Sequence, residues 1–171
     1  MNELLFERIY LHELLLISSA SLLLYCCIIW LSPPQKRKQL SMVSFLAWYV
    51  FSVLCYTVFC RKMGNLTQFR PIPFYNLFDG VTPFSQFIYE GVLNMAMFVP
   101  IGMGAALARW NRWCIMGGAL LLSLSIETMQ WFFKCGCCEM NDVINNSIGC
   151  AIGLGLAQLF RCIILFSNDK N

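Results

Sequence analysis

The 171-residue sequence predicts an all-α fold, a polytopic membrane helix bundle of about five transmembrane helices. Apolar residues make up 58% of the chain and charged residues only 12%, which lies outside the composition of water-soluble domains. The mean hydropathy of +0.64 agrees with this. Long apolar runs also recur along the chain, and each is near the length that crosses about 30 Å of hydrocarbon as a helix.

Five runs are predicted to span the membrane, because each contains at most one charged residue. The first follows a stretch with acidic residues instead of the basic region of a signal peptide, so we expect it to be retained. The five are Leu14–Leu31, Leu40–Cys60, Phe84–Ala108 with Glu90, Trp113–Phe133 with Glu127, and Val143–Phe160.

One long connection, Arg61–Pro83, separates the second and third predicted spans. It contains helix-interrupting residues, among them Pro71, Pro73 and Gly80, and is predicted to be an ordered or re-entrant loop at the membrane surface. We therefore divide the chain into an N-terminal two-span segment (1–62), a three-span region with this loop (63–166) and a tail (167–171).

The distribution of Lys and Arg predicts the orientation, because cytoplasmic loops are enriched in both. One side of the membrane would carry seven of them, Lys36, Arg37, Lys38, Arg109, Arg112, Arg161 and Lys170. The other side would carry five, Arg8, Arg61, Lys62, Arg70 and Lys134. The prediction is an integral membrane protein with the N-terminus outside and the C-terminus inside.

Under this topology the last three helices bring carboxylates and amides to a similar depth on the outer side. A carboxylate at membrane depth is costly unless it is paired, protonated or hydrated. Glu127 therefore requires a partner, either a neighbouring amide or Arg70 as a counter-ion. Asp142 is also a candidate N-cap of the last helix. The candidate polar-pocket residues are Arg70, Glu90, Asn94, Glu127, Gln130, Asp142, Asn145 and Asn146.

Six of the ten cysteines lie in or at the ends of apolar runs, where a thiol behaves as a small hydrophobe. The other four, Cys60, Cys135, Cys137 and Cys138, leave both a disulfide and free thiols open. The single histidine, His12, lies far from them, so zinc is the weaker interpretation and no metal or cofactor is predicted. The net charge of +3 is spread over short loops and does not indicate nucleic-acid binding.

Two further patterns concern the shape of the helices. Gly149-x-x-x-Gly153 predicts close helix packing, because glycines let two backbones approach in a membrane. Pro100 is expected to kink the third span.

Four short motifs follow one another in the second half of the chain: Pro71–Phe74, Asn94–Gly102, Ser125–Gln130, and Asn141–Gly149 followed by Gly153. Their order and spacing resemble the VanZ-like family, named for a protein of glycopeptide-resistance clusters that lowers susceptibility to teicoplanin. The resemblance covers roughly Arg70–Phe160. This chain has Gly136 and Glu139 where the family often has an Arg and an Asp. At the positions that match the family's motifs, the polar residues of this chain are Asn94, Glu127, Gln130, Asp142 and Asn145.

The resemblance implies a protein of the bacterial cytoplasmic membrane. It also implies a role in resistance to teicoplanin-type or lipid-associated antibiotics through an outward-facing polar pocket. Membrane lipids, and a lipid-linked envelope precursor or a glycopeptide, are the candidate partners. One alternative is an intramembrane enzyme that modifies lipids or envelope precursors, with Glu127 and Asp142 as acid and base. Another is a structural accessory subunit whose polar residues only join helices. Catalysis and oligomeric state stay open.

Overall fold

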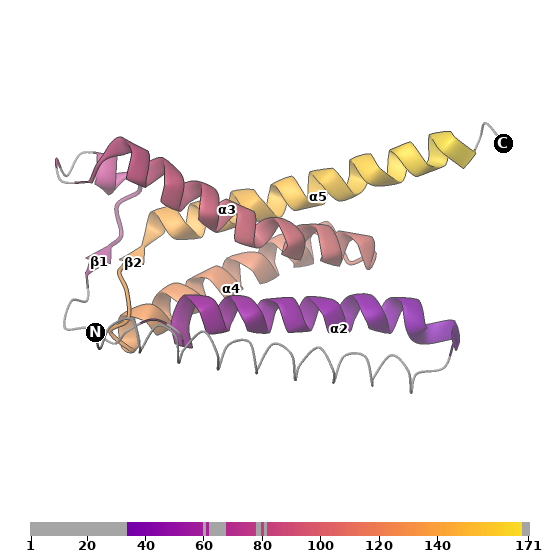
Figure 1. Ribbon diagram of the computed structural model, residues 1–171, viewed down its shortest axis with the longest axis horizontal. Coiled ribbons are helices and arrows are strands. Elements are labelled where there is room, and N and C mark those ends of the chain that lie inside the picture. The colour runs from indigo at the N-terminus through magenta and orange to yellow at the C-terminus, as the bar shows by residue number, and fades with distance from the viewer. Residues whose placement is uncertain (1–33, 60, 62–67, 78–79, 81, 169–171) are drawn as a thin grey trace, which may run out of the picture. The chain divides into compact units, whose positions relative to one another are not determined.

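The computed structural model describes residues 34–59, 61, 68–77, 80 and 82–168. These residues are mostly helical, which confirms the all-α membrane fold (Figure 1). Within this part of the chain, four helical segments are long and apolar enough to cross a membrane: Gln39–Phe59, Phe84–Leu107, Arg112–Phe132 and Met140–Ile163. The predicted first span, Leu14–Leu31, lies outside the described residues.

The chain divides into two compact units, Met1–Lys62 and Met63–Asn171. In the first unit, α2 (Pro34–Leu54) continues into a π-helical stretch, η1 (Cys55–Phe59). The helix begins six residues earlier than Leu40, the start that we predicted, so the charged run 36–38 is helical and not a loop. Proline is favourable in a first helical turn, and Lys, Arg and Gln are good helix formers. These residues extend the helix beyond its apolar part.

The second unit contains three long helices, one 3₁₀ turn and two short strands. They are β1 (Phe69–Arg70), η2 (Tyr75–Leu77), α3 (Phe84–Leu107), α4 (Arg112–Phe132), β2 (Cys138–Glu139) and α5 (Met140–Asn168).

The ends of α4 and α5 follow from local polar residues. Before α4, Oδ1 of Asn111 accepts a hydrogen bond from the backbone N–H of Trp113, at 2.8 Å, and caps the helix. The helix α5 extends beyond both ends of the predicted span, Val143–Phe160, because that prediction included only the apolar residues. Because α5 begins at Met140, Asp142 lies in its first turn and is not an N-cap. A carboxylate is favourable there, near the positive end of the helix dipole.

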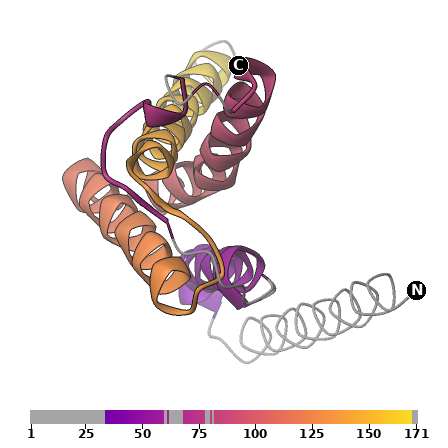
Figure 2. The same cartoon turned by 90° about the vertical axis from the view of Figure 1, so that its left-hand side faces the viewer.

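Glycines bring the backbones of α3 and α5 into direct contact, and both views show the two helices side by side (Figures 1 and 2). A Cβ added to Gly149 would overlap the carbonyl oxygen of Met95, and one added to Gly153 would overlap that of Val99. The packing role predicted for the glycine pair is confirmed. Where lipid removes the hydrophobic drive between helices, this close approach supplies van der Waals contact.

A short parallel pairing ties the segment before α3 to the connection between α4 and α5. Phe69 lies opposite Cys138, and Arg70 lies opposite Glu139 (Figure 1). The segment 68–77 is thereby held at the end of the helices where α4 finishes and α5 starts. The described part of the predicted surface loop is ordered, with β1 and the η2 turn as its regular elements.

We expect Gly149→Ala to lower the free energy of unfolding by roughly 1–3 kcal/mol, because the new methyl group forces α3 away from α5. The measurement is thermal or denaturant unfolding in detergent. Gly155→Ala is the matched control on the same helix, since Gly155 has no described atom within 4 Å of an added Cβ. Equal stability of the two variants would contradict the assigned packing.

Candidate functional site

Glu127 lies near the end of α4 and is almost fully buried, with 3% of its surface exposed. Its Oε2 accepts a hydrogen bond from the backbone N–H of Glu139, at 2.9 Å. That N–H belongs to the residue just before α5, so the carboxylate joins the end of one helix to the start of the next. A bond from a backbone N–H to an ionised acceptor is stronger than one between neutral groups.

A second polar contact lies one turn further into the bundle. Oγ of Ser123 on α4 accepts a hydrogen bond from Nδ2 of Asn146 on α5, at 2.8 Å. The two residues are 0% and 3% exposed, and Gln130 is 2% exposed on the same face of α4. The polar face formed by Ser123, Glu127 and Gln130 therefore points into the protein and not into lipid.

The segment 68–77 is attached to the start of α5 through its backbone. Oδ1 of Asn141 accepts a hydrogen bond from the N–H of Phe74 at 2.6 Å, and the N–H of Cys138 donates to the carbonyl of Gln68 at 3.0 Å. Phe74 has a φ of 60°, which is uncommon for a residue with a side chain. The hydrogen bond that Phe74 donates to Asn141 stabilises this conformation and so the turn that follows it.

Arg70 is the centre of the polar cluster at this junction. Its Nη1 lies 3.1 Å from Oε1 of Glu139, forming an ion pair, and also donates to Oδ1 of Asn76 at 2.7 Å. Asn76 is buried and donates from Nδ2 to Oε2 of Glu139, at 2.8 Å. Oε1 of Gln68 accepts from Nε and Nη2 of Arg70, at 3.0 and 2.6 Å. The guanidinium is therefore neutralised and held in a fixed orientation.

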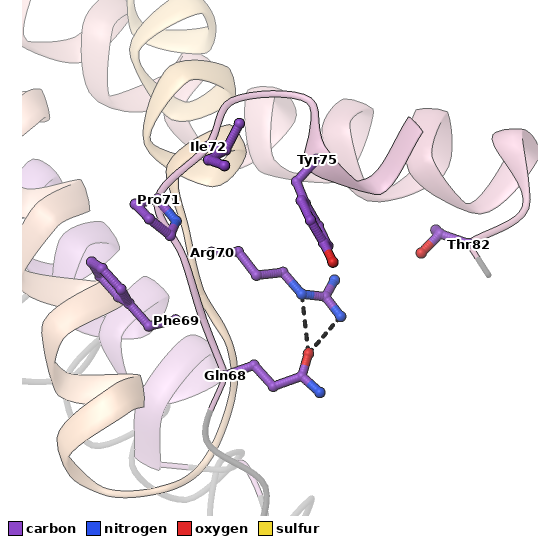
Figure 3. Close-up of a pocket in the computed structure, with 7 residues that line it drawn as sticks. All are labelled: Gln68, Phe69, Arg70, Pro71, Ile72, Tyr75 and Thr82. Carbon is purple, nitrogen blue, oxygen red and sulfur yellow. Dashed lines mark hydrogen bonds between the residues drawn. The ribbon is translucent and has the colours of Figure 1, made fainter. Parts of the chain in front are cut away.

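A recess of about 640 Å³ lies beside Arg70. Figure 3 shows the side chain of Arg70 between Gln68 and Tyr75, with Thr82 across the opening. The guanidinium lies 5.7 Å from the centre of the Tyr75 ring, within the range of a cation–π contact. The other lining residues are Phe69, Pro71 and Ile72. The recess thus combines one fixed cation with aromatic and aliphatic walls.

The structure brings four of the predicted residues to the junction of α4, α5 and the segment 68–77. Arg70, Glu127 and Asn146 bond there, and Gln130 is buried on the same face of α4. Arg70 was one of the candidate partners for Glu127, beside the neighbouring amides, and in the structure its ion pair is with Glu139. The β-pairing places Arg70 opposite Glu139, which explains why these two residues form the ion pair.

Two further predicted residues lie on the first turns of α5. Nδ2 of Asn145 is 3.1 Å from the place of an added Cβ on Gly91, so this side chain packs against α3. Asp142 is half-buried. Both therefore lie at the same end of the unit as Glu127.

The predicted residues of α3 lie in a more exposed environment than those of the junction. Asn94 is half-exposed on this helix. Glu90 is exposed, and its Oε1 accepts a hydrogen bond from Gln86 at 2.9 Å along the helix surface. The contacts described for Glu90 do not connect it to Arg70 or Glu127.

Four residues of the junction were absent from the predicted set: Asn76, Ser123, Glu139 and Asn141. Glu139 could have been found, because it is a carboxylate in the short connection before the last span, on the same predicted side as Arg70. Asn141 belongs to the last of the four motifs. Asn76 and Ser123 carry no such signal, since an amide in a loop and a hydroxyl on a helix are common.

The thiols of Cys135, Cys137 and Cys138 are free, while Cys60 lies outside the described residues. Burial raises the pKa of the Cys138 thiol, and the negative charges of Glu127, Asp142 and Glu139 raise that pKa further. No group of three His, Cys, Asp or Glu side chains suited to a metal ion occurs in the part of the chain that the structure describes.

A family model described as VanZ/LLP1 matches residues 20–161, which is more than half of the chain. Comparisons with curated proteins and with solved structures give no match.

We expect Glu127→Ala to be more destabilising than Glu127→Gln. Alanine leaves the half-buried N–H of Glu139 without its acceptor, at a cost of about 1–3 kcal/mol, whereas glutamine keeps an oxygen near the same place. Denaturant unfolding of the two purified variants in detergent measures the difference. An equal loss of stability would show that the negative charge, and not the hydrogen bond, is what the junction requires.

Proposed function

Because the chain belongs to the VanZ/LLP1 family, we propose that it lowers the susceptibility of a bacterium to teicoplanin-type glycopeptides or other lipid-associated antibiotics. The observation that carries the proposal is the recess beside Arg70, at the junction of α4, α5 and the segment 68–77. A recess at the end of membrane helices is suited to the lipid-associated part of such a drug, or to the lipid-linked envelope precursor that the drug attacks.

The size and chemistry of the recess support a small amphipathic ligand. Its volume of about 640 Å³ lies within the range of about 300–1,000 Å³ that is usual for small-molecule sites. Apolar walls with a few fixed polar groups are typical of such sites. Arg70 is already oriented by Gln68, Asn76 and Glu139, so little side-chain entropy is lost when a ligand contacts it.

The proposed location is the external face of the cytoplasmic membrane. The recess lies at the end of α4 and the start of α5, whereas Arg109, Arg112 and Arg161 lie toward the opposite ends of the helices. If the end with more Lys and Arg is cytoplasmic, the recess faces outward. Lipid-linked envelope precursors and large antibiotics would meet the protein on that side.

The environment of Glu127 supports a positioning role and not proton transfer. A general acid or base must reach its substrate within hydrogen-bond distance. Glu127 is 3% exposed, and one carboxylate oxygen is bonded to the connection before α5. We therefore assign the buried carboxylate to holding the junction, and the contact with ligand to the walls of the recess.

We expect Arg70→Gln to abolish most of the protection that the wild-type protein gives, measured as the inhibitory concentration of teicoplanin in a susceptible host at equal membrane abundance. Lys134→Gln is the control, because it removes one positive charge from the α4–α5 connection without altering the lining of the recess. Tyr75→Ser should weaken protection while leaving the Arg70–Glu139 ion pair intact. Full protection by both Arg70→Gln and Tyr75→Ser would rule out the recess as the site.

The orientation predicts which thiols react in intact cells. In variants that keep a single cysteine, a membrane-impermeant maleimide should label Cys138 and should label Cys162, near the other end of α5, only after permeabilisation. Since the thiolate is the reactive form and the pKa of Cys138 is raised, labelling of Cys138 should become faster as the pH is increased. The reverse labelling pattern would place the recess on the cytoplasmic side.

A further inference from the structure

We propose that the recess beside Arg70 binds the phosphate-bearing headgroup of an anionic membrane lipid, with Arg70 as the phosphate ligand. The proposal rests on the proposed function and names the class of ligand for the same recess. Three features of the described residues support it: the level of the recess along the helices, its exposed apolar walls, and the hydrogen bonds already made by Arg70.

The recess lies at the level of the helix ends. Arg70 in β1 is paired with Glu139 in β2, and β2 lies between the end of α4 at Phe132 and the start of α5 at Met140. Trp131 and Phe132, at the end of α4, are 50% and 72% exposed. Exposed aromatic side chains at the end of a membrane helix are typical of the headgroup region. The segment that lines the recess is therefore at the depth of lipid headgroups.

The walls of the recess present apolar surface that no described part of the chain covers. Ile72 is 62% exposed and Tyr75 is 43% exposed, and both line the recess. In an integral membrane protein, the molecule that covers such surface at headgroup depth is a lipid. The upper part of an acyl chain would contact Ile72 and Tyr75 while the headgroup reaches Arg70.

The guanidinium of Arg70 retains capacity for an anion. A guanidinium has five N–H groups. Four hydrogen bonds are made, from Nε to Gln68, from Nη1 to Asn76 and Glu139, and from Nη2 to Gln68. Nη2 thus has a second N–H for which the described residues provide no acceptor. Phosphate oxygens match the planar fork of a guanidinium and form charge-assisted hydrogen bonds with it.

Glu139 is the internal competitor for this cation. Its Oε1 is paired with Arg70 at 3.1 Å, while its Oε2 accepts from Asn76 at 2.8 Å. If a phosphate takes the place of Oε1 at Arg70, Glu139 still keeps the hydrogen bond from Asn76. The lipid can therefore exchange with one oxygen of Glu139 without leaving that carboxylate unpartnered. Removing the negative charge of Glu139 should accordingly strengthen lipid binding.

The experiment uses the full chain purified in detergent and measures bound phosphatidylglycerol and phosphatidylcholine by native mass spectrometry. We expect wild type to prefer phosphatidylglycerol. The double variant R70Q/E139Q, in which two neutral amides replace the ion pair, should bind phosphatidylglycerol about tenfold more weakly, a change of about 1.4 kcal/mol. Glu139→Gln alone should bind it more tightly, a gain that misfolding cannot produce.

Three results would overturn the assignment: equal binding of the two lipids by wild type, unchanged phosphatidylglycerol binding in R70Q/E139Q, or weaker binding in Glu139→Gln. Inorganic phosphate that displaces phosphatidylglycerol at an equal concentration would also overturn it, because the apolar walls would then contribute nothing. The assay does not read drug susceptibility. If the protein shows no preference for phosphatidylglycerol but still protects against the antibiotic, the lipid assignment is wrong and the proposed function is unaffected.

Discussion

The junction between α4 and α5 depends on Glu139, which binds its neighbours through both its backbone and its side chain. Its N–H donates a hydrogen bond to the buried carboxylate of Glu127. Its own carboxylate forms an ion pair with Arg70 and accepts a hydrogen bond from Asn76. The ion pair is partly exposed, with 25% of the Arg70 side chain and 13% of the Glu139 side chain accessible, so water screens part of its charge. The end of one helix, the start of the next and the segment 68–77 are thus linked through a single residue.

This linkage explains how so short a β-pairing persists. Each strand has two residues, which is far too little for independent stability. The ion pair between Arg70 and Glu139, together with the hydrogen bond from Phe74 to Asn141, anchors the segment on either side of the proline-rich turn. The recess is formed by this segment, so its shape follows from contacts made outside its own lining.

The helix α5 uses two different kinds of contact with its neighbours. Gly149 and Gly153 place its backbone against α3, whereas Asn146 forms a hydrogen bond with Ser123 of α4. Both are contacts that work in a membrane, where apolar side chains gain little by leaving lipid for one another. Small residues allow close approach to one helix, and a buried amide fixes the position of the other.

The sequence by itself determined the membrane fold class, the four described spans to within a few residues at most ends, and the packing role of Gly149 and Gly153. These features follow from apolar run length and from residue size, which are local properties. It also singled out Glu127 as a carboxylate that needs a partner, with Arg70 as one candidate. Only the tertiary structure decided that Glu139 serves both of them, because the pairing of β1 with β2 joins segments nearly seventy residues apart in the chain. No local pattern specifies such a contact, and it is this contact that holds the segment lining the recess beside Arg70.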